Sequence, residues 1–173
     1  LRFNPNILVY VVDDCTPREC KESVIIFQKI ASIPERVTLL RTPVNKLKAG
    51  ALNCALQYIK GESNSHIPEV ILTLDDDVVI NVETVRNLVD ELASYEHLGA
   101  VCSQCRVLNK NKNVLTRLQG LEYLGFNAIR LADEGFIRGP LVMHGMLTAF
   151  RAAALFNVGG FSEGHLIEDY EIT

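Results

Sequence analysis

The stretch that decides the fold is Val70-Ile-Leu-Thr-Leu-Asp75-Asp76-Asp77-Val-Val-Ile-Asn81, in which a short apolar run leads directly into three carboxylates. Such a run is typical of a strand buried on both faces of a parallel sheet. In open α/β sheets, ligands bind beyond the carboxyl ends of the strands. Adjacent carboxylates repel one another there, and oxygen ligands of this type suit Mg²⁺ or Mn²⁺. The stretch therefore predicts a metal site; the alternative is a group of acids that caps the following helix.

The composition is that of an ordinary globular chain, with 48% hydrophobic and 22% charged residues and a net charge of −4. The length predicts one domain over residues 1–173. A mildly acidic chain without a basic block is a poor candidate for binding nucleic acid. No apolar run approaches the roughly 18 residues of a membrane span. The five cysteines lack the spacing of a zinc or disulfide framework, so we expect reduced thiols.

Apolar periodicity divides the chain into alternating strands and helices. Strands are expected at 7–12, 37–40, 70–74, 100–107 and 141–150, and helices at 21–33, 49–59, 82–94, 114–131 and 152–156. Strand and helix alternate over the first hundred residues, which is the pattern of a doubly wound parallel sheet.

Carboxylates recur at two further places: Asp13-Asp14 follows the first predicted strand, and Glu168-Asp169 lies near the end of the chain. Adjacent strand ends of a doubly wound sheet converge on one cleft. One acidic, metal-dependent site is therefore more plausible than three unrelated patches. A polyphosphate ligand suits such a site, because a metal neutralises its charge and a further acid can serve as a base.

Six short motifs carry a family resemblance. They are Val12-Asp-Asp-Cys-Thr, Lys48-Ala-Gly-Ala-Leu-Asn53, Leu74-Asp-Asp-Asp77, Gly145-Met-Leu-Thr-Ala-Phe-Arg151, Gly159-Gly-Phe161 and Glu168-Asp169. In this order they resemble the inverting glycosyltransferases of family 2 over nearly the whole chain. Residues 48–53 and the segment Leu118-Gln-Gly-Leu-Glu-Tyr123 are most similar to the processive β-polysaccharide synthases, which make poly-N-acetylglucosamine, hyaluronan, cellulose and chitin.

The resemblance implies a GT-A fold, a Rossmann-like nucleotide-sugar-binding domain with a mostly parallel central sheet. Residues 1–107 would form the nucleotide-binding half and residues 108–173 the acceptor-binding half. The implied reaction transfers a sugar from a UDP-sugar, UDP-N-acetylglucosamine or UDP-glucose, to a saccharide hydroxyl. Family members also carry an earlier strand and later membrane helices. We therefore expect this chain to be an internal part of a longer protein that acts at the cytoplasmic face of a membrane.

The family's donor-side roles carry over to matching residues. Asp14, with Asp13 beside it, resembles the acid that reads the uracil ring, and Lys48 resembles a lysine near the nucleotide. Asp75 and Asp77 match the D-x-D motif, in which Asp77 would hold the metal and Asp75 would face the sugar or ribose and the metal. The middle acid of the triplet is expected to point elsewhere.

The acceptor-side roles fall in the last third of the chain. Asp169 matches the catalytic base that deprotonates the acceptor hydroxyl. Gly145 matches a small residue of the acceptor pocket, and Glu168 precedes the base. His144 stands where these synthases more often carry a small hydroxyl residue, and it is either an acceptor contact or a core histidine.

Other interpretations stay open at the level of sequence. A haloacid-dehalogenase-like phosphohydrolase would use Asp75 as nucleophile and Asp77 as acid/base, although its remaining motifs fit poorly. A phospho-receiver domain, a single-transfer family 2 enzyme and a binding module without turnover are further alternatives. Asp13 or Asp14 could simply cap a helix, Lys48 could be a solvated charge, and Gly145 could be a turn glycine.

Overall fold

The computed structural model describes residues 6–33, 35–62, 67–81, 83–137, 139–164 and 167–173. The chain divides into two compact units, the first made of Leu1–Ile67 and Gly160–Glu168 and the second of Pro68–Gly159 and Asp169–Thr173. This division by compactness does not follow the predicted functional halves, because residues 68–107 belong to the second unit. The functional halves stay a prediction.

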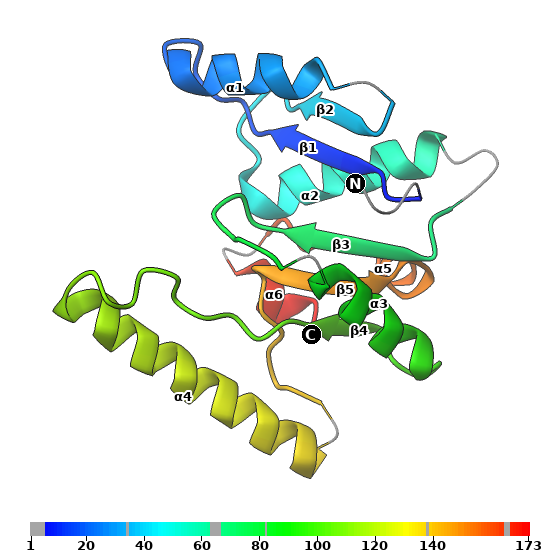
Figure 1. Cartoon of the computed structure of the whole chain (residues 1–173). Coiled ribbons are helices and arrows are strands. Elements are labelled where there is room, and N and C mark those ends of the chain that lie inside the picture. The colour runs from blue at the N-terminus through cyan, green and yellow to red at the C-terminus, as the bar shows by residue number, and fades with distance from the viewer. Residues whose placement is uncertain (1–5, 34, 63–66, 82, 138, 165–166) are drawn as a thin grey trace. The chain divides into compact units, whose positions relative to one another are not determined.

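The first unit contains two parallel strands, β1 (Val9–Asp13) and β2 (Val37–Arg41). Helix α1 (Lys21–Ala31) packs against β2, and α2 (Leu47–Glu62) packs against β1 (Figure 1). The pairing register joins Val9 to Val37 at one end and Asp13 to Arg41 at the other. The two strands therefore end side by side, so the polar residues that follow them meet at one edge.

The second unit is built on three strands in the order β3-β5-β4: β3 (Val70–Leu74), β4 (Ala100–Cys102) and β5 (Leu147–Arg151). The remaining elements of the chain are α3 (Thr84–Ser94), α4 (Val114–Ile137), α5 (Ala152–Asn157) and α6 (Glu168–Glu171). Helix α3 packs against β4 and β5, and α5 packs against β5. Leu88 of α3 joins Leu147 and Ala149 of β5 in the core of this unit.

The α/β class predicted from the sequence is confirmed, and the parallel order holds for β1 and β2. Strand β5 is the exception, because it runs antiparallel to both of its neighbours, β3 and β4. This reversed strand separates β3 and β4, which consequently run in the same direction as each other. The prediction of a mostly parallel α/β fold is therefore confirmed, with β5 as its antiparallel strand.

Element boundaries differ from the predictions mainly in the second unit. The predicted strand at 100–107 ends at Cys102, and only residues 147–151 of the region beyond 141 form a strand. Helix α4 extends past its predicted end at residue 131 to Ile137 and contains Gly120 and Gly125 within it. The predicted helix start at residue 82 lies outside the described residues.

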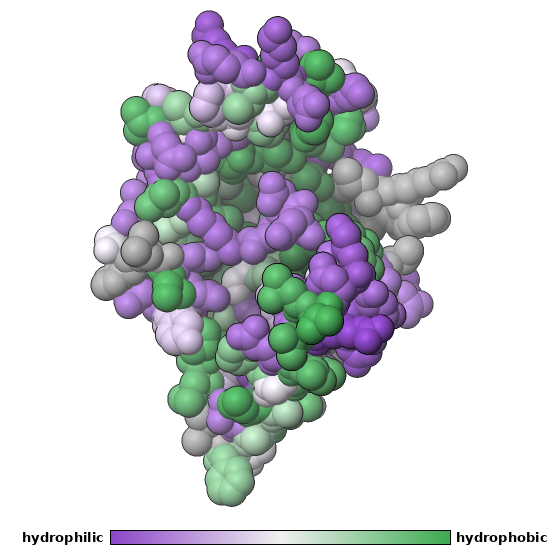
Figure 2. All heavy atoms as spheres, turned by 90° about the vertical axis from the view of Figure 1, so that its left-hand side faces the viewer, coloured by the Kyte–Doolittle hydropathy of each residue, from purple (hydrophilic) through white to green (hydrophobic). Residues whose placement is uncertain are grey.

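Helix α4 turns a stripe of three polar side chains inward and leaves most of its large apolar residues exposed. This inner stripe contains Tyr123, Asn127 and Arg130. Tyr123 contacts Met146, Asn127 contacts the Cys105 carbonyl, and Arg130 contacts the Val142 carbonyl. The large apolar residues exposed on α4 are Val114, Leu115, Leu118, Leu121, Leu124, Phe126, Ile129, Leu131 and Phe136. Figure 2 shows exposed apolar side chains on the side of the molecule that lies to the left in Figure 1. None of the helices in the described ranges combines the length and apolar character needed to cross a bilayer.

Candidate functional site

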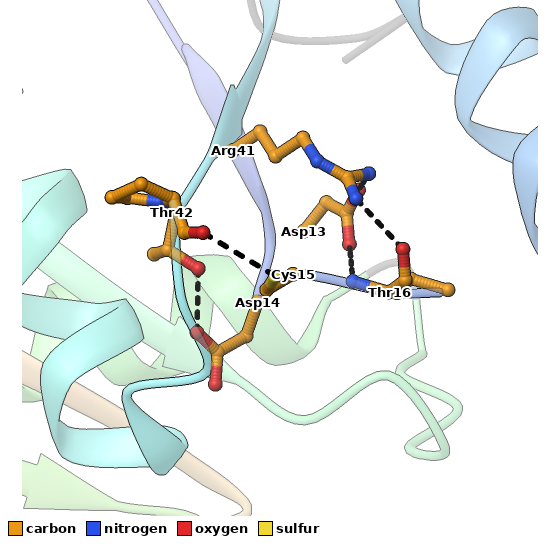
Figure 3. A network of polar contacts seen from close by, with 7 residues as sticks. Asp13, Asp14, Cys15, Thr16, Arg41 and Thr42 are labelled. Atoms are coloured by element: carbon orange, nitrogen blue, oxygen red, sulfur yellow. Dashed lines mark hydrogen bonds and ion pairs between the residues drawn. The ribbon is translucent and has the colours of Figure 1, made fainter. Parts of the chain in front are cut away.

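The carboxylate of Asp13 is engaged within the first unit. It is buried, and its Oδ1 accepts a hydrogen bond from the Thr16 N–H (2.9 Å) while its Oδ2 pairs with Arg41 Nη1. Arg41 also donates from Nη2 to the Thr16 carbonyl (2.7 Å) (Figure 3). Burial alone would raise the pKa of Asp13, but the Thr16 hydrogen bonds and the Arg41 charge outweigh it and hold that pKa below its usual value. These contacts link the end of β1 to the end of β2 and favour a structural role for Asp13.

Asp14 holds the loop that follows β2. Its Oδ1 accepts from Thr42 Oγ1 (2.7 Å) (Figure 3). The backbone N–H of Lys46 donates to the same oxygen (2.9 Å), and Oδ2 also lies 3.1 Å from that nitrogen. Cys15, the next residue, has φ of 60°, a left-handed conformation that is uncommon outside glycine. Neither acid caps α1, whose N-cap is Cys20. The helix-capping alternative for this pair is therefore wrong.

Lys48 and Glu168 are brought together within the first unit. The Lys48 Nζ lies 2.8 Å from Glu168 Oε1, and the Glu168 carboxylate is buried. The sequence motifs assigned these two side chains to opposite substrates, the nucleotide and the acceptor. The structure shows that they form one ion pair, so Lys48 is not merely a solvated charge. Their roles toward the two substrates stay predictions.

The acidic triplet follows β3 in a turn, in which the Val78 N–H donates to the Asp75 carbonyl (3.3 Å). Asp75 is half-buried, whereas Asp76 and Asp77 are exposed. The Asp75 N–H donates to the Met146 carbonyl (3.0 Å), which joins this turn to the residues just before β5. The triplet precedes α3 without providing its N-cap, which is Glu83. The predicted orientation of Asp75 and Asp77 toward a ligand stays a prediction.

Asp169 and Gly145 lie together in the second unit. The Gly145 N–H donates to Asp169 Oδ2 (3.1 Å), and Thr173 Oγ1 donates to the Asp169 carbonyl (2.7 Å). Thr173 Oγ1 also accepts from the Met143 N–H (3.0 Å). The predicted base and the predicted acceptor-pocket glycine are thus neighbours. Asp169 is half-buried, so its carboxylate is held in place without being removed from solvent.

His144 is a buried, neutral histidine beside this pair. Its ring stacks on Tyr123 of α4, with centroids 6.2 Å apart and planes inclined by 11°. Burial, together with the nearby Arg130 charge, lowers the pKa of His144 to about 4, although Asp169 acts in the opposite direction. At neutral pH the imidazole is therefore uncharged, and a role as a proton donor to substrate at that pH is disfavoured.

Three buried polar atoms at this place have no hydrogen-bond partner among the described residues: His144 Nε2, Asn127 Oδ1 and Arg130 Nη1. Asn127 donates from Nδ2 to the Cys105 carbonyl (3.1 Å), which fixes the direction of its amide. Arg130 donates from Nε to the Val142 carbonyl (2.8 Å). The inner stripe of α4 therefore holds the segment before β5 through polar contacts that are incompletely satisfied.

The structure adds residues that the motifs did not single out. Arg41 could have been found from the parallel register, since it directly faces Asp13. Tyr123 lay inside a quoted motif without an assigned role, and Asn127 and Arg130 carried no motif signal. Asn53 closed the motif at 48–53 and proves to contact Phe161 and Glu163.

A divalent cation fits the donor chemistry of the triplet. Asp75 and Asp77 supply hard oxygen ligands, which suit Mg²⁺ or Mn²⁺. Over the described ranges, no group of three or more His, Cys, Asp or Glu side chains is arranged to hold a metal ion. A cation bound through one or two carboxylates together with substrate phosphates needs no such cluster. The pair Asp75 and Asp77 fits that mode of binding.

An α/β fold with acids at two strand ends, and an aspartate held beside a glycine before the reversed strand, agrees with the GT-A fold that the motifs imply. The chain belongs to glycosyl transferase family 2, whose family model matches residues 2–158. The predicted family and class of enzyme domain are thereby confirmed. The haloacid-dehalogenase interpretation is not favoured, because the match covers both strand-end acid groups.

Two comparisons with individual proteins agree with this family. The chain is 28% identical over 130 residues to a poly-β-1,6-N-acetyl-D-glucosamine synthase of Staphylococcus epidermidis, a match that covers 75% of the chain and 30% of that relative. A second sequence of the same name and organism matches equally. The fold resembles that of the mannosyltransferase PcManGT from Pyrobaculum calidifontis, solved with GDP-Man and Mn²⁺, with a TM-score of 0.66 and 23% identity over 95% of the chain and 41% of that structure. The chain thus spans less than half the length of these relatives.

Proposed function

We propose that this domain transfers a sugar from a UDP-sugar to a saccharide hydroxyl with inversion, as part of β-linked polysaccharide synthesis at the cytoplasmic face of a membrane. The observation that carries the proposal is the hydrogen bond from the Gly145 N–H to Asp169 Oδ2. It holds a half-buried carboxylate, with one oxygen oriented, beside the glycine of the predicted acceptor pocket. A positioned carboxylate of this kind is suited to general-base catalysis.

In this proposal Asp169 accepts the proton of the acceptor hydroxyl while the hydroxyl oxygen attacks the anomeric carbon from the face opposite the nucleotide. The new carbon–oxygen bond forms as the bond from the anomeric carbon to the diphosphate breaks, which inverts the configuration. A divalent cation on Asp75 and Asp77 would stabilise the negative charge of the departing nucleotide. His144, neutral and stacked on Tyr123, supports the acceptor segment without transferring a proton.

On the donor side we retain Asp14 and Lys48 as nucleotide-binding candidates. Asp13 is assigned to holding the strand ends together, since its carboxylate is buried and pairs with Arg41, whereas Asp14 is half-buried. Glu168 is assigned to its pair with Lys48. A nucleotide near Lys48 would therefore meet a lysine whose charge is shared with a buried carboxylate, and Glu168 would act on the acceptor only through its neighbour in sequence, Asp169.

The similarity to a poly-β-1,6-N-acetyl-D-glucosamine synthase supports UDP-N-acetylglucosamine as donor and a growing saccharide as acceptor. UDP-glucose remains the second donor of the proposal. The neighbour solved with GDP-Man and Mn²⁺ supports a nucleotide-sugar and a divalent metal. A single-transfer family 2 enzyme stays the alternative. The exposed apolar side of α4 is consistent with an apolar neighbour, as a membrane enzyme would provide.

Calorimetric titration of the folded protein with UDP, GDP and UDP-N-acetylglucosamine, each with and without Mn²⁺, tests the donor assignment. We expect UDP and its sugar to bind only in the presence of metal, and GDP to bind more weakly. An Asp77→Asn variant should lose the metal-dependent part, whereas the neighbouring Asp76→Asn variant should keep it. Equal binding of GDP would contradict the uracil assignment, and binding that is indifferent to Mn²⁺ would contradict the metal assignment.

A further inference from the structure

The motif Lys48 to Asn53 lies on α2, and both of its polar ends contact the segment Gly160–Glu168. At one end Asn53 accepts from the Phe161 N–H (2.9 Å) and donates to the Phe161 carbonyl (2.7 Å). The same amide nitrogen lies 3.0 Å from Glu163 Oε1. At the other end Lys48 pairs with Glu168, the residue bonded directly to Asp169.

The double contact at Phe161 is a specific one. A single asparagine side chain satisfies both backbone groups of a buried residue, as a paired strand would do. The pairing also fixes the amide of Asn53, because its oxygen must face the Phe161 N–H and its nitrogen the carbonyl. Neither a hydrophobic residue nor a longer polar one at position 53 can reproduce both bonds.

Gly160 shows how closely the two segments approach. It has φ of 86°, and a Cβ placed on it would lie 2.7 Å from Asn53 Oδ1 and 3.2 Å from Leu56 Cδ1. Gly159 has the same φ of 86°, yet a Cβ placed there meets nothing within 4 Å. The glycine pair therefore separates two requirements: both positions need a left-handed backbone, but only Gly160 needs room for Asn53.

We infer that Asn53 is a positioning residue for the base: Asn53 and Lys48 hold Phe161 and Glu168 against α2, and Glu168 is bonded directly to Asp169. This inference rests on the proposed function, in which Asp169 is the base. Glu168 is held by Lys48 and Phe161 by Asn53, so the described contacts bracket the segment immediately before Asp169. A displacement of about 1 Å at a reacting group can lower a rate by about a hundredfold.

The experiment compares Gly160→Ala with Gly159→Ala in the intact protein. Both variants carry the same strain of an alanine with positive φ, but only Gly160→Ala displaces the Asn53 amide. We expect kcat for sugar transfer to fall roughly 10- to 100-fold more in Gly160→Ala than in Gly159→Ala, with the dissociation constant for UDP unchanged within about twofold. Equal losses of kcat in the two variants would overturn the inference.

Asn53→Ala provides a second variant in case Gly160→Ala fails to fold. It should lower kcat to a similar extent, keep UDP affinity, and increase the hydrogen exchange of the Phe161 amide. A loss of UDP affinity equal to the loss of kcat, or full kcat despite faster exchange at Phe161, would contradict a positioning role. Asp169→Asn distinguishes the two proposals: if it retains transfer, the base assignment itself fails, whatever the result at Asn53.

Discussion

The ends of β1 and β3 have the same sequence signature and different structures. Each is an apolar strand followed by consecutive acids, Asp13-Asp14 in one case and Asp75 to Asp77 in the other. After β1, the acids are engaged by Arg41, Thr42, and the backbone N–H groups of Thr16 and Lys46. After β3, two of the three acids are exposed. The same sequence signature therefore precedes partnered acids after β1 and two exposed acids after β3.

The cause of the difference lies in what borders each strand. Strand β2 ends beside β1 and contributes Arg41 in register with Asp13, together with the start of a loop whose N–H groups reach Asp14. Strand β3 borders β5, and the residue that approaches its end, Met146, offers a carbonyl oxygen to the Asp75 N–H. We expect Asp13 to contribute to stability and the exposed Asp77 to contribute to function.

The largest expected effect is on activity at the end of β3. Asp77→Asn should lower sugar transfer on the order of 10²- to 10³-fold, because it removes a negatively charged ligand for the cation, while thermal stability stays within about 0.5 kcal/mol since the side chain is exposed. Steady-state transfer assays and thermal unfolding measure the two quantities. A large loss of stability with unchanged turnover would contradict this expectation, because Asp77 would then act as Asp13 does after β1.

Buried polar groups extend the comparison, since Asp13 is partnered, whereas His144 Nε2 has no hydrogen-bond partner in the described part of the chain. The pKa of His144 is lowered to about 4 in the folded state, from 6.5. The unfolded state therefore binds more protons between these pH values, and stability falls as pH falls from about 6.5 to 4. His144→Phe keeps a ring against Tyr123 and cannot titrate. Denaturant unfolding should show that, between pH 6.5 and 4, the free energy of unfolding falls on the order of 1–3 kcal/mol more in the wild type than in this variant. Parallel pH profiles would contradict the assignment of a buried neutral histidine.

Asp13→Asn should destabilise the protein by about 1–2 kcal/mol, because a buried carboxylate loses its charge opposite Arg41. The folded pKa of Asp13 lies below its ordinary value of 3.8. Its contribution is therefore fully present above that value and is lost as pH falls through the folded pKa. The stability difference between wild type and variant should narrow below about pH 4. UDP binding measured on the folded variant should persist. Complete loss of UDP binding would instead support the predicted role of Asp13 in binding the nucleotide.

The smallest expected effect is at Asp76, the exposed middle acid. Asp76→Asn should change the activation free energy of sugar transfer and the free energy of unfolding by less than about 0.5 kcal/mol each, as is usual for surface substitutions. The same assays apply, with Asp77→Asn as the matched comparison one residue away. A loss as large as that of Asp77→Asn would show that the whole triplet, and not the D-x-D pair, serves the ligand.

Much of the fold could be predicted because local patterns specify it. The apolar run before Asp75 is a strand, Lys21 begins a helix, and Gly159 and Gly160 follow the end of α5 with positive φ. The direction of a strand is harder to predict from the sequence. Nothing in the apolar run Leu147–Arg151 shows that it lies reversed between two strands, since direction depends on how the chain returns to the sheet.

The candidate site divides in the same way. The sequence by itself determined the family, through motifs in a fixed order, and the kinds of group available: strand-end acids, the lysine of α2 and the aspartate after Glu168. Only the tertiary structure decided their partners, because a carboxylate bonds whichever donor lies within reach. It joined Asp13 to Arg41, Lys48 to Glu168, and Gly145 to Asp169, pairs separated by 24 to 120 residues in the chain. Strand pairing and helix packing bring such distant residues into contact, and local sequence patterns do not specify either of them.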